Sequence, residues 1–269
     1  MFQNDLFKDK IALVTGGRSG IGYAIAKMML QLGAKVTICS RKEGALKKSA
    51  EELQAFGECD FKACDIRQEE DIKALAAHIK EQHGRLDILV NNAGGQFPAL
   101  AEYINNKGWN AVINNNLNGT FFMTRQMATS FFIPQKKGNI INITANVLRG
   151  FPGMAHTGAA RAGVENLTKT LAVEWSEYNI RINCVAPGTI ESSGLATYPK
   201  PVQDMFEEAR EAVPLKRFGT VEDVANTVCF LASPLASYIT GICLYVDGAQ
   251  HLNSDVMGLP KVFKKMMGK

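Results

Sequence analysis

Apolar segments of strand length alternate with helical patterns along most of the chain. The first apolar run, Ile11 to Val14, is followed by a glycine-rich turn and then by helical spacing from Tyr23 to Leu30. Six further segments predict strands, namely Lys35–Cys39, Asp60–Cys64, Leu86–Val90, Gly138–Ile143, Ile180–Val185 and Ile242–Val246. Such alternation requires crossover connections between parallel strands. The sequence therefore predicts an α/β fold, with a doubly wound, mostly parallel seven-stranded sheet and helices on both faces.

The composition fits one compact domain. The chain has 269 residues, 46% of them hydrophobic, and we find no internal repeat, low-complexity segment or linker. We expect a single domain over residues 1–269, with a core at 6–250, a variable substrate lid at about 189–213 and a tail at 251–269. The net charge of +4 comes from scattered basic residues, which argues against nucleic-acid binding.

Cysteine usage and the two ends of the chain bear on the compartment. The six cysteines show neither metal-ligand spacing nor the density of a disulfide scaffold, so we expect buried thiols and no metal site. The N-terminus has no apolar signal core, no stretch is long and apolar enough to span a membrane, and the C-terminus lacks a Ser-Lys-Leu type signal. These features predict a cytoplasmic protein.

The turn after the first strand reads Thr15-Gly-Gly-Arg-Ser-Gly-Ile-Gly22. A strand, a glycine turn and a helix N-terminus in this order bring backbone amides close to a pyrophosphate. Glycine turns also end ordinary helices, so the motif is weak evidence by itself. The residues expected to hold a dinucleotide here are Gly16, Arg18, Ser19, Gly20, Ile21 and Gly22.

The second predicted strand ends in Ser40-Arg41-Lys42, where enzymes that use NADH place a carboxylate for the ribose 2′-hydroxyl. Positive charge at this point favours a 2′-phosphate, with Arg41 as its main partner and Ser40, Lys42 and Arg18 nearby. We therefore predict NADPH (NADP) as the cofactor. A solvated basic turn is the alternative, and Glu43 argues in its favour.

Several motifs together resemble the short-chain dehydrogenase/reductase superfamily over about residues 6 to 250. Besides the glycine turn they are Asn91-Asn-Ala-Gly94, Asn116-Leu-Asn-Gly-Thr-Phe121, Pro187-Gly188 and Asp247-Gly248. The resemblance implies a single-domain Rossmann fold. It also implies further cofactor contacts from Asp65, Ile66, Asn92, Ala93, Gly94, Pro187, Gly188, Thr189 and Ile190. Asn116 matches the asparagine of the family's catalytic tetrad, which holds a helix kink and a water of the proton relay.

The chain departs from this family at the other catalytic positions. Either Ala145 replaces the family's serine or Thr144 partly substitutes for it. The segment His156-Thr-Gly-Ala-Ala-Arg-Ala-Gly-Val164 places Thr157 at the tyrosine position and Arg161 at the lysine position. Threonine is too weak an acid for ordinary acid catalysis but still donates hydrogen bonds, and arginine keeps a positive charge for the nicotinamide ribose.

The absence of the family's tyrosine and lysine narrows the range of reactions that the site could catalyse. Hydride addition to a carbonyl carbon requires prompt protonation of an alkoxide, whereas addition to the β-carbon of an unsaturated thioester gives a delocalised enolate. An enolate first needs hydrogen bonds, which Thr157, backbone amides and Arg161 could supply. The sequence therefore favours enoyl reduction.

Several segments resemble the peroxisomal trans-2-enoyl-CoA reductases, among them Asn92 to Phe97, His156 to Val164 and Arg181 to Gly188. The resemblance implies NADPH-dependent reduction of fatty 2-enoyl-CoA esters. The 2,4-dienoyl-CoA reductases also lack the tyrosine at the Thr157 position, but they keep a lysine at the Arg161 position. Dienoyl reduction is therefore the second choice.

The sequence defines the proton donor and the residues that contact the substrate less clearly. His156 and Tyr198 are candidate donors, although His156 could simply pack in the interior and Tyr198 could only contact substrate. Glu165, four residues past Arg161, is expected to lie outside the pocket and to pair with Arg161. Gln96 and Phe97 are expected to line the pocket mouth and contact the acyl chain.

Two other classes of function stay open. The chain could be a catalytically silent NADPH-binding sensor or scaffold, or a 3-ketoacyl or other carbonyl oxidoreductase with a relocated acid. The resemblance also implies a homo-oligomer, for which we expect a tetramer built from the helices that begin near Gly119 and Gly158 and from the last strand.

Overall fold

Seven parallel strands form one sheet in the order β3-β2-β1-β4-β5-β6-β7. The computed structural model describes residues 5–191 and 208–252. The strands are β1 (Ile11–Thr15), β2 (Lys35–Ser40), β3 (Cys59–Ala63), β4 (Ile88–Asn91), β5 (Gly138–Ile143), β6 (Ile180–Pro187) and β7 (Cys243–Val246). Each predicted strand is present, with ends that differ by at most two residues from those observed. The predicted doubly wound α/β fold is confirmed.

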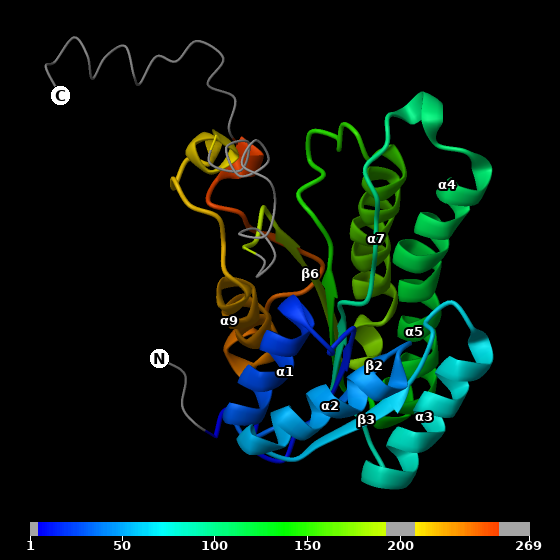
Figure 1. Cartoon of the computed structure of the whole chain (residues 1–269). Helices are drawn as coiled ribbons and strands as arrows, with labels where there is room; N and C mark the ends of the chain where they lie inside the picture. The colour runs from blue at the N-terminus through cyan, green and yellow to red at the C-terminus, as the bar shows by residue number, and fades with distance from the viewer. Residues whose placement is uncertain (1–4, 192–207, 253–269) are drawn as a thin grey trace, which may run out of the picture.

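Helices cover both faces of the sheet (Figure 1). Helices α1, α2 and α9 pack on one face, and α3, α5 and α7 pack on the other. Their bounds are α1 (Gly20–Gln31), α2 (Glu43–Leu53), α3 (Glu69–His83), α4 (Asn106–Ile113), α5 (Gly119–Met127), α6 (Ile133–Gln135), α7 (Ala155–Glu174) and α9 (Val221–Ala232). Residues 208–212, in the predicted lid, are also helical. None of the helices in the described residues is both long and apolar enough to cross a membrane.

The continuous apolar run in β1 reflects burial on both faces of the sheet. All five of its residues are buried, and they alternate between the two hydrophobic clusters, with Ala12 and Val14 toward α1 and Ile11 and Leu13 toward α3. Burial on both faces explains why parallel strands lack the polar alternation of half-exposed strands.

The strand order reverses beside β1, which pairs with β2 on one edge and with β4 on the other. The loops after β1 and β4 therefore leave the sheet in opposite directions and open a crevice at its carboxyl edge, where open α/β sheets bind ligands. The residues between α4 and α5, Asn114–Asn118, form a π-helical turn rather than a regular α-helix.

Candidate active site

The crevice at the switch point contains a cavity of about 320 Å³. The loops after β1, β2, β3 and β4 surround it. Its described lining residues are Gly16, Arg18, Ser19, Cys39, Ser40, Arg41, Lys42, Cys64, Asp65, Ile66, Asn92, Ala93, Gly94 and Asn115. Eleven of these residues are predicted cofactor contacts, so the structure brings together residues spread over about eighty positions of the sequence.

The glycine turn is locked to the loop after β4. Thr15 Oγ1 accepts hydrogen bonds from the backbone amides of Asn92 and Ala93, both at 2.9 Å. The side-chain amide of Asn92 in turn donates from Nδ2 to the carbonyl oxygens of Thr15 and Gly16. A side chain at Gly22 would place its Cβ 2.4 Å from Asn92 Nδ2, so this glycine permits close packing of the helix against the loop, although Gly22 itself does not line the cavity.

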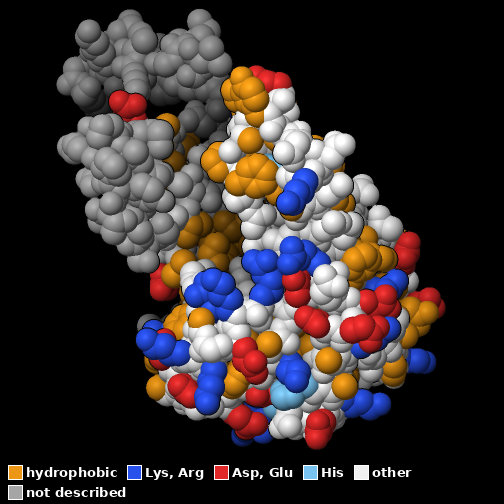
Figure 2. All heavy atoms as spheres, turned by 45° about the vertical axis from the view of Figure 1, so that its right-hand side comes forward, with side chains coloured by type: hydrophobic (Ala, Val, Ile, Leu, Met, Phe, Trp, Pro, Cys, Tyr) orange, Lys and Arg blue, Asp and Glu red, His pale blue; other side chains and the backbone are white. Residues whose placement is uncertain are grey.

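Basic side chains gather at one end of this cavity, where Arg18, Arg41 and Lys42 line it. Lys and Arg side chains are also visible near the middle of the face in Figure 2, beside a hollow. The hydroxyl of Ser40 is buried there and has no hydrogen-bond partner among the described residues. The acid in the lining, Asp65, is already paired with Arg67, whose hydrogen bonds lower the pKa of the carboxyl group.

A second cavity, of about 780 Å³, adjoins the first and shares Asn92 and Gly94 with it. It opens above the ends of β5 and β6. Its described lining residues are Ile21, Asn92, Gly94, Gly95, Gln96, Ile143, Thr144, Ala145, Asn146, Phe151, Met154, Arg161, Pro187, Gly188, Thr189, Ile190 and Gln250. Within the described part of the chain, this lining contains one titratable side chain, Arg161, and neither a tyrosine nor a lysine.

Arg161 lies on α7 and is only 7% exposed. Its Nη1 donates to the carbonyl oxygen of Ile143 at 2.9 Å, while its Nε has no partner in the described structure. A Cβ at Gly94 would lie 2.3 Å from Arg161 Nη2, so the guanidinium packs directly over this loop, where the two cavities meet. Burial lowers the pKa of Arg161 to about 10, and the group is therefore a positive charge at neutral pH.

Thr144 and Asn146 follow β5 and supply neutral polar groups to the wall of the second cavity. The Thr144 hydroxyl lies 3.3 Å from the Val185 carbonyl oxygen, to which it donates, and 3.9 Å from the sulfur of Cys243. The Asn146 amide donates to Asp247 Oδ2 at 3.1 Å. Thr144, rather than Ala145, thus brings a hydroxyl to the serine region of the family.

Thr157 and His156 lie deeper than Arg161, at the start of α7. Both are fully buried, and neither is among the lining residues of the two cavities. His156 Nδ1 accepts the backbone N–H of Thr157 at 2.8 Å, and the Thr157 hydroxyl lies 3.3 Å from the same nitrogen. The His156 ring meets the edge of Phe97, which is 40% exposed and does not line the cavities either.

Asn116 holds the loop after β4 to the π-helical turn. Its Nδ2 donates to the carbonyl oxygens of Gly95, at 2.7 Å, and of Val112, and its Oδ1 accepts the Gly95 N–H. The amide is therefore fully engaged in backbone contacts. Asn115, the preceding residue, faces the first cavity instead.

The strand β6 delivers the remaining predicted contacts, Pro187 to Ile190, to the wall of the second cavity. Gln250 Oε1 accepts the Thr189 N–H at 3.2 Å and completes that wall. Sequence reasoning missed Gln250 and Asn146, although the position of Gln250 just after Asp247-Gly248 was a usable signal. Tyr198, predicted to contact substrate, lies outside the described residues.

The described residues contain no group of three or more His, Cys, Asp or Glu side chains arranged to hold a metal ion. All six cysteines are free thiols, and five of them are buried.

Comparisons with known proteins agree with this architecture. Residues 16–251 match a family model described as enoyl-(acyl carrier protein) reductase. A probable 2,4-dienoyl-CoA reductase of Bacillus subtilis is 40% identical over 91% of this chain and 97% of its own length. A 3-oxoacyl-[acyl-carrier-protein] reductase of Thermotoga maritima is 39% identical over 89% of this chain and 96% of its own.

A solved structure of a citronellol catabolism dehydrogenase from Pseudomonas aeruginosa superposes with a TM-score of 0.83. It is 41% identical and covers 93% of this chain and 98% of its own. The printed names of these relatives specify different substrates. The chain belongs to the short-chain dehydrogenase/reductase family of oxidoreductases.

Proposed function

We propose that this protein is an NADPH-dependent reductase of the α,β double bond of trans-2-enoyl thioesters, with fatty enoyl-CoA as the substrate. One observation carries the proposal. The second cavity contains a buried guanidinium and neutral hydrogen-bond donors, but none of its described lining residues is a tyrosine or lysine that could act as a paired acid. Such a site suits an enolate better than an alkoxide.

The first cavity fits a dinucleotide with a 2′-phosphate. Its wall includes the glycine turn after β1 and the loop after β4, which are held together by the hydrogen bonds between Thr15 and Asn92. The unpartnered Ser40 hydroxyl beside Arg41 and Lys42 is a set of donors suited to a phosphate. Because the Asp65 carboxylate is paired with Arg67, no acid in the described lining is free to repel that phosphate. The cofactor, when bound, supplies the hydride.

The residues of the second cavity would stabilise the charge that follows hydride addition. Electrons move from the double bond to the thioester oxygen as the β-carbon gains its new C–H bond. The positive charge of Arg161, at the junction with the first cavity, is the group best placed to stabilise this enolate. The hydroxyl of Thr144 can join it by giving up its hydrogen bond to the Val185 carbonyl oxygen. Asn116, Thr157 and His156 act as positioning residues in this proposal, because their contacts are with the protein itself.

Dienoyl-CoA reduction is the second candidate, favoured by the printed name of the Bacillus subtilis relative. It would place the same kind of delocalised anion in the same cavity. The Thermotoga maritima relative is named for a carbonyl reaction, so a ketone substrate belongs in the same test.

The test uses the purified full chain with NADPH and, in separate reactions, crotonyl-CoA, a 2,4-dienoyl-CoA and acetoacetyl-CoA, with turnover followed by cofactor absorbance. We expect the highest kcat/KM with crotonyl-CoA. Reduction of acetoacetyl-CoA alone would refute enoyl reduction and indicate a carbonyl reductase. Tight NADPH binding without turnover of any of the three would indicate the silent-binder class.

The cofactor is tested separately by titrating the protein with NADPH and NADH and following the fluorescence of the reduced nicotinamide. We expect a lower Kd for NADPH. Equal affinities would refute a role of the Ser40 to Lys42 turn in 2′-phosphate binding.

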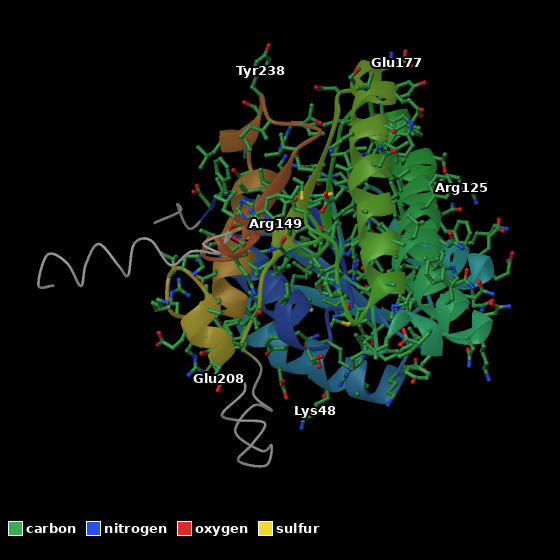
Figure 3. The ribbon with its side chains drawn as sticks, turned by 90° about the horizontal axis from the view of Figure 1, so that it is seen from above. Lys48, Arg125, Arg149, Glu177, Glu208 and Tyr238 are labelled. Atoms are coloured by element: carbon green, nitrogen blue, oxygen red, sulfur yellow. The ribbon has the colours of Figure 1, made fainter. Side chains whose placement is uncertain are left out.

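We also propose a homo-oligomer. The sheet ends at β7, and large apolar side chains near it are exposed, among them Leu235 at 64%, Ile242 at 39% and Tyr238, which projects from the rim of the molecule in Figure 3. Light scattering coupled to gel filtration should give the mass of a tetramer, and a monomer would refute the proposal.

A further inference from the structure

One contact in the wall of the second cavity joins a side-chain carboxamide to a threonine. Gln250 begins a short helical turn after β7, Thr189 follows β6, and both residues line the cavity. Gln250 Oε1 accepts the Thr189 N–H at 3.2 Å, and Gln250 Nε2 donates to Thr189 Oγ1 at 3.4 Å. A Cβ at Gly188 would lie 2.7 Å from Gln250 Oε1, so the glycine leaves room for this group. A primary carboxamide is thus bound to Thr189 through both of its polar ends.

Thr189 is held in place independently of Gln250. Its carbonyl oxygen accepts the N–H of Gly219 at 3.0 Å, and the Gly219 carbonyl oxygen accepts the N–H of Glu191 at 2.8 Å. The neighbouring Ile190 forms a bridge with Gly219 as well. The N–H and the hydroxyl of Thr189 are therefore a fixed pair of hydrogen-bonding groups in the cavity wall.

The backbone of Gln250 is held firmly, whereas its side-chain carboxamide is held loosely. The Gln250 N–H donates to the Asp247 carbonyl oxygen at 3.0 Å. Ala249 has a left-handed φ of 68°, which a Cβ disfavours, and Asp247 Oδ1 maintains this turn by accepting the Ala249 N–H. The contacts of the carboxamide with Thr189, at 3.2 to 3.5 Å, are long for hydrogen bonds. The carboxamide can therefore leave Thr189 while the turn stays in place.

The proposed cofactor carries the same chemical group. Hydride transfer into the second cavity requires the nicotinamide ring to lie there, and this ring bears a primary carboxamide. The cavity extends from Asn92 and Gly94, where it meets the first cavity, to Thr189 and Ile190. Thr189 offers an N–H to the oxygen of a carboxamide and a hydroxyl oxygen to its NH2 group. A carboxamide of the ligand and that of Gln250 would compete for the same two partners.

We propose that Gln250 occupies the place of the nicotinamide carboxamide at Thr189 and is displaced when the cofactor binds. The inference rests on the proposed nicotinamide cofactor, but it does not depend on which substrate is reduced. In the free protein Gln250 satisfies the Thr189 N–H, which has no other partner among the described residues. On binding, the cofactor takes over this N–H and the hydroxyl, and the Gln250 side chain turns away. Gln250 therefore weakens the binding of the nicotinamide end and favours release of the cofactor.

Removal of the carboxamide should tighten cofactor binding. Gln250→Ala should lower the Kd for NADPH by about fivefold, because one ordinary hydrogen bond no longer has to be given up. Gln250→Met, which keeps the length of the side chain without the amide, should lower the Kd to a similar extent. Both are measured by titration of the nicotinamide fluorescence. The ligand control is adenosine 2′,5′-bisphosphate, which lacks the nicotinamide end and should bind the wild type and both variants with equal Kd in calorimetry.

A double-mutant cycle separates competition from a general change of the wall. In the wild type the Thr189 hydroxyl contacts Gln250 in the free protein and the ligand in the complex, so Thr189→Val should change the Kd for NADPH by less than about twofold. In the Gln250→Ala background the same substitution removes a contact of the ligand alone, and the Kd should rise by about fivefold. Equal effects of Thr189→Val in the two backgrounds would overturn the competition.

These measurements need no turnover and no assumption about the 2′-phosphate. The titrations are repeated with NADH, for which ADP serves as the ligand without nicotinamide, so a wrong cofactor preference does not decide the result. An unchanged or raised Kd for both dinucleotides in Gln250→Ala would overturn the role of Gln250 and leave the proposed reductase standing. A wild type that binds neither dinucleotide would overturn the proposed function and, with it, the inference about Gln250.

Discussion

Replacing Arg161 by methionine should make the protein more stable and less active. Methionine has a similar length and no charge, so it fills the same space without the cost of a buried guanidinium. Burial lowers the pKa of Arg161 from the usual value of a guanidinium to about 10. At about 1.4 kcal/mol per pKa unit, the charged form is disfavoured by about 3 kcal/mol in the folded protein.

Part of that cost is offset by the hydrogen bond from Arg161 Nη1 to the Ile143 carbonyl oxygen, at 2.9 Å. A hydrogen bond from a charged group contributes about 2 kcal/mol, which leaves a net gain of about 1 kcal/mol for Arg161→Met. The activity should fall by at least about a hundredfold, the usual effect of removing an oxyanion-stabilising group.

The matched control is Arg181→Met. Arg181 is also partly buried, but its guanidinium donates to the carbonyl oxygens of Ile239, Leu231 and Ser233 at 2.9 to 3.2 Å. The substitution removes three such bonds, two to the end of α9 and one to the segment before β7, so it should destabilise the protein by about 3 kcal/mol or more. The two arginine variants are therefore expected to change stability in opposite directions.

The assay is urea unfolding of the cofactor-free proteins, followed by circular dichroism, with the midpoints compared at equal slopes.

The stability of the wild type also depends on pH, and the sign of this dependence follows from the lowered pKa of Arg161. Above about pH 10 the folded protein begins to release the Arg161 proton while the unfolded chain still holds it, so wild-type stability gains with rising pH and the advantage of Arg161→Met shrinks. An Arg161→Met protein less stable than wild type at neutral pH would refute this reasoning.

Three further predictions concern other residues of the site. Arg41→Asp should raise the Kd for NADPH by about tenfold or more and lower it for NADH, measured by fluorescence titration, and an unchanged ratio would place the 2′-phosphate contact elsewhere. Gly94→Ala puts a Cβ 2.3 Å from Arg161 Nη2 and should reduce kcat at least about tenfold, whereas Gly44→Ala, with no atom within 4 Å, should keep wild-type kcat and gain about 0.5 kcal/mol of stability. Thr157→Val should keep kcat within about threefold, because the hydroxyl contacts His156 and does not line the cavity; a much larger loss would assign this hydroxyl to the chemistry.

The wall of the first cavity could be predicted from the sequence because its residues are consecutive at strand ends. The turn after β1 and the Asn-Asn-Ala-Gly segment at the end of β4 can each be recognised from the spacing of consecutive residues. A parallel sheet then places all such strand ends on one edge. The family that the sequence suggested is also the one to which the chain belongs.

The wall of the second cavity could not be predicted in the same detail. Whether a side chain lines a cavity or is buried behind it depends on neighbours from distant segments of the chain. Thr157 occupies a motif position, yet its short side chain does not line the cavity in the described structure. The sequence suggested that Glu165 pairs with Arg161, yet the guanidinium of Arg161 donates to the carbonyl oxygen of Ile143 on β5. A helix pattern shows which face a residue occupies, but not which strand will lie opposite.

The contact between the loops after β4 and β5 has a consequence for how the protein admits its substrate. The backbone N–H of Ala99 donates to the carbonyl oxygen of Gly153 at 2.7 Å, and Ala99 bridges to Met154. Gln96, on the first loop, and Phe151 and Met154, on the second, belong to the wall of the larger cavity. Since the two loops are tied together, widening this part of the cavity wall for a bulkier acyl group of the proposed substrate would mean moving both loops as one unit. A redesign of chain-length preference should therefore alter the two loops jointly.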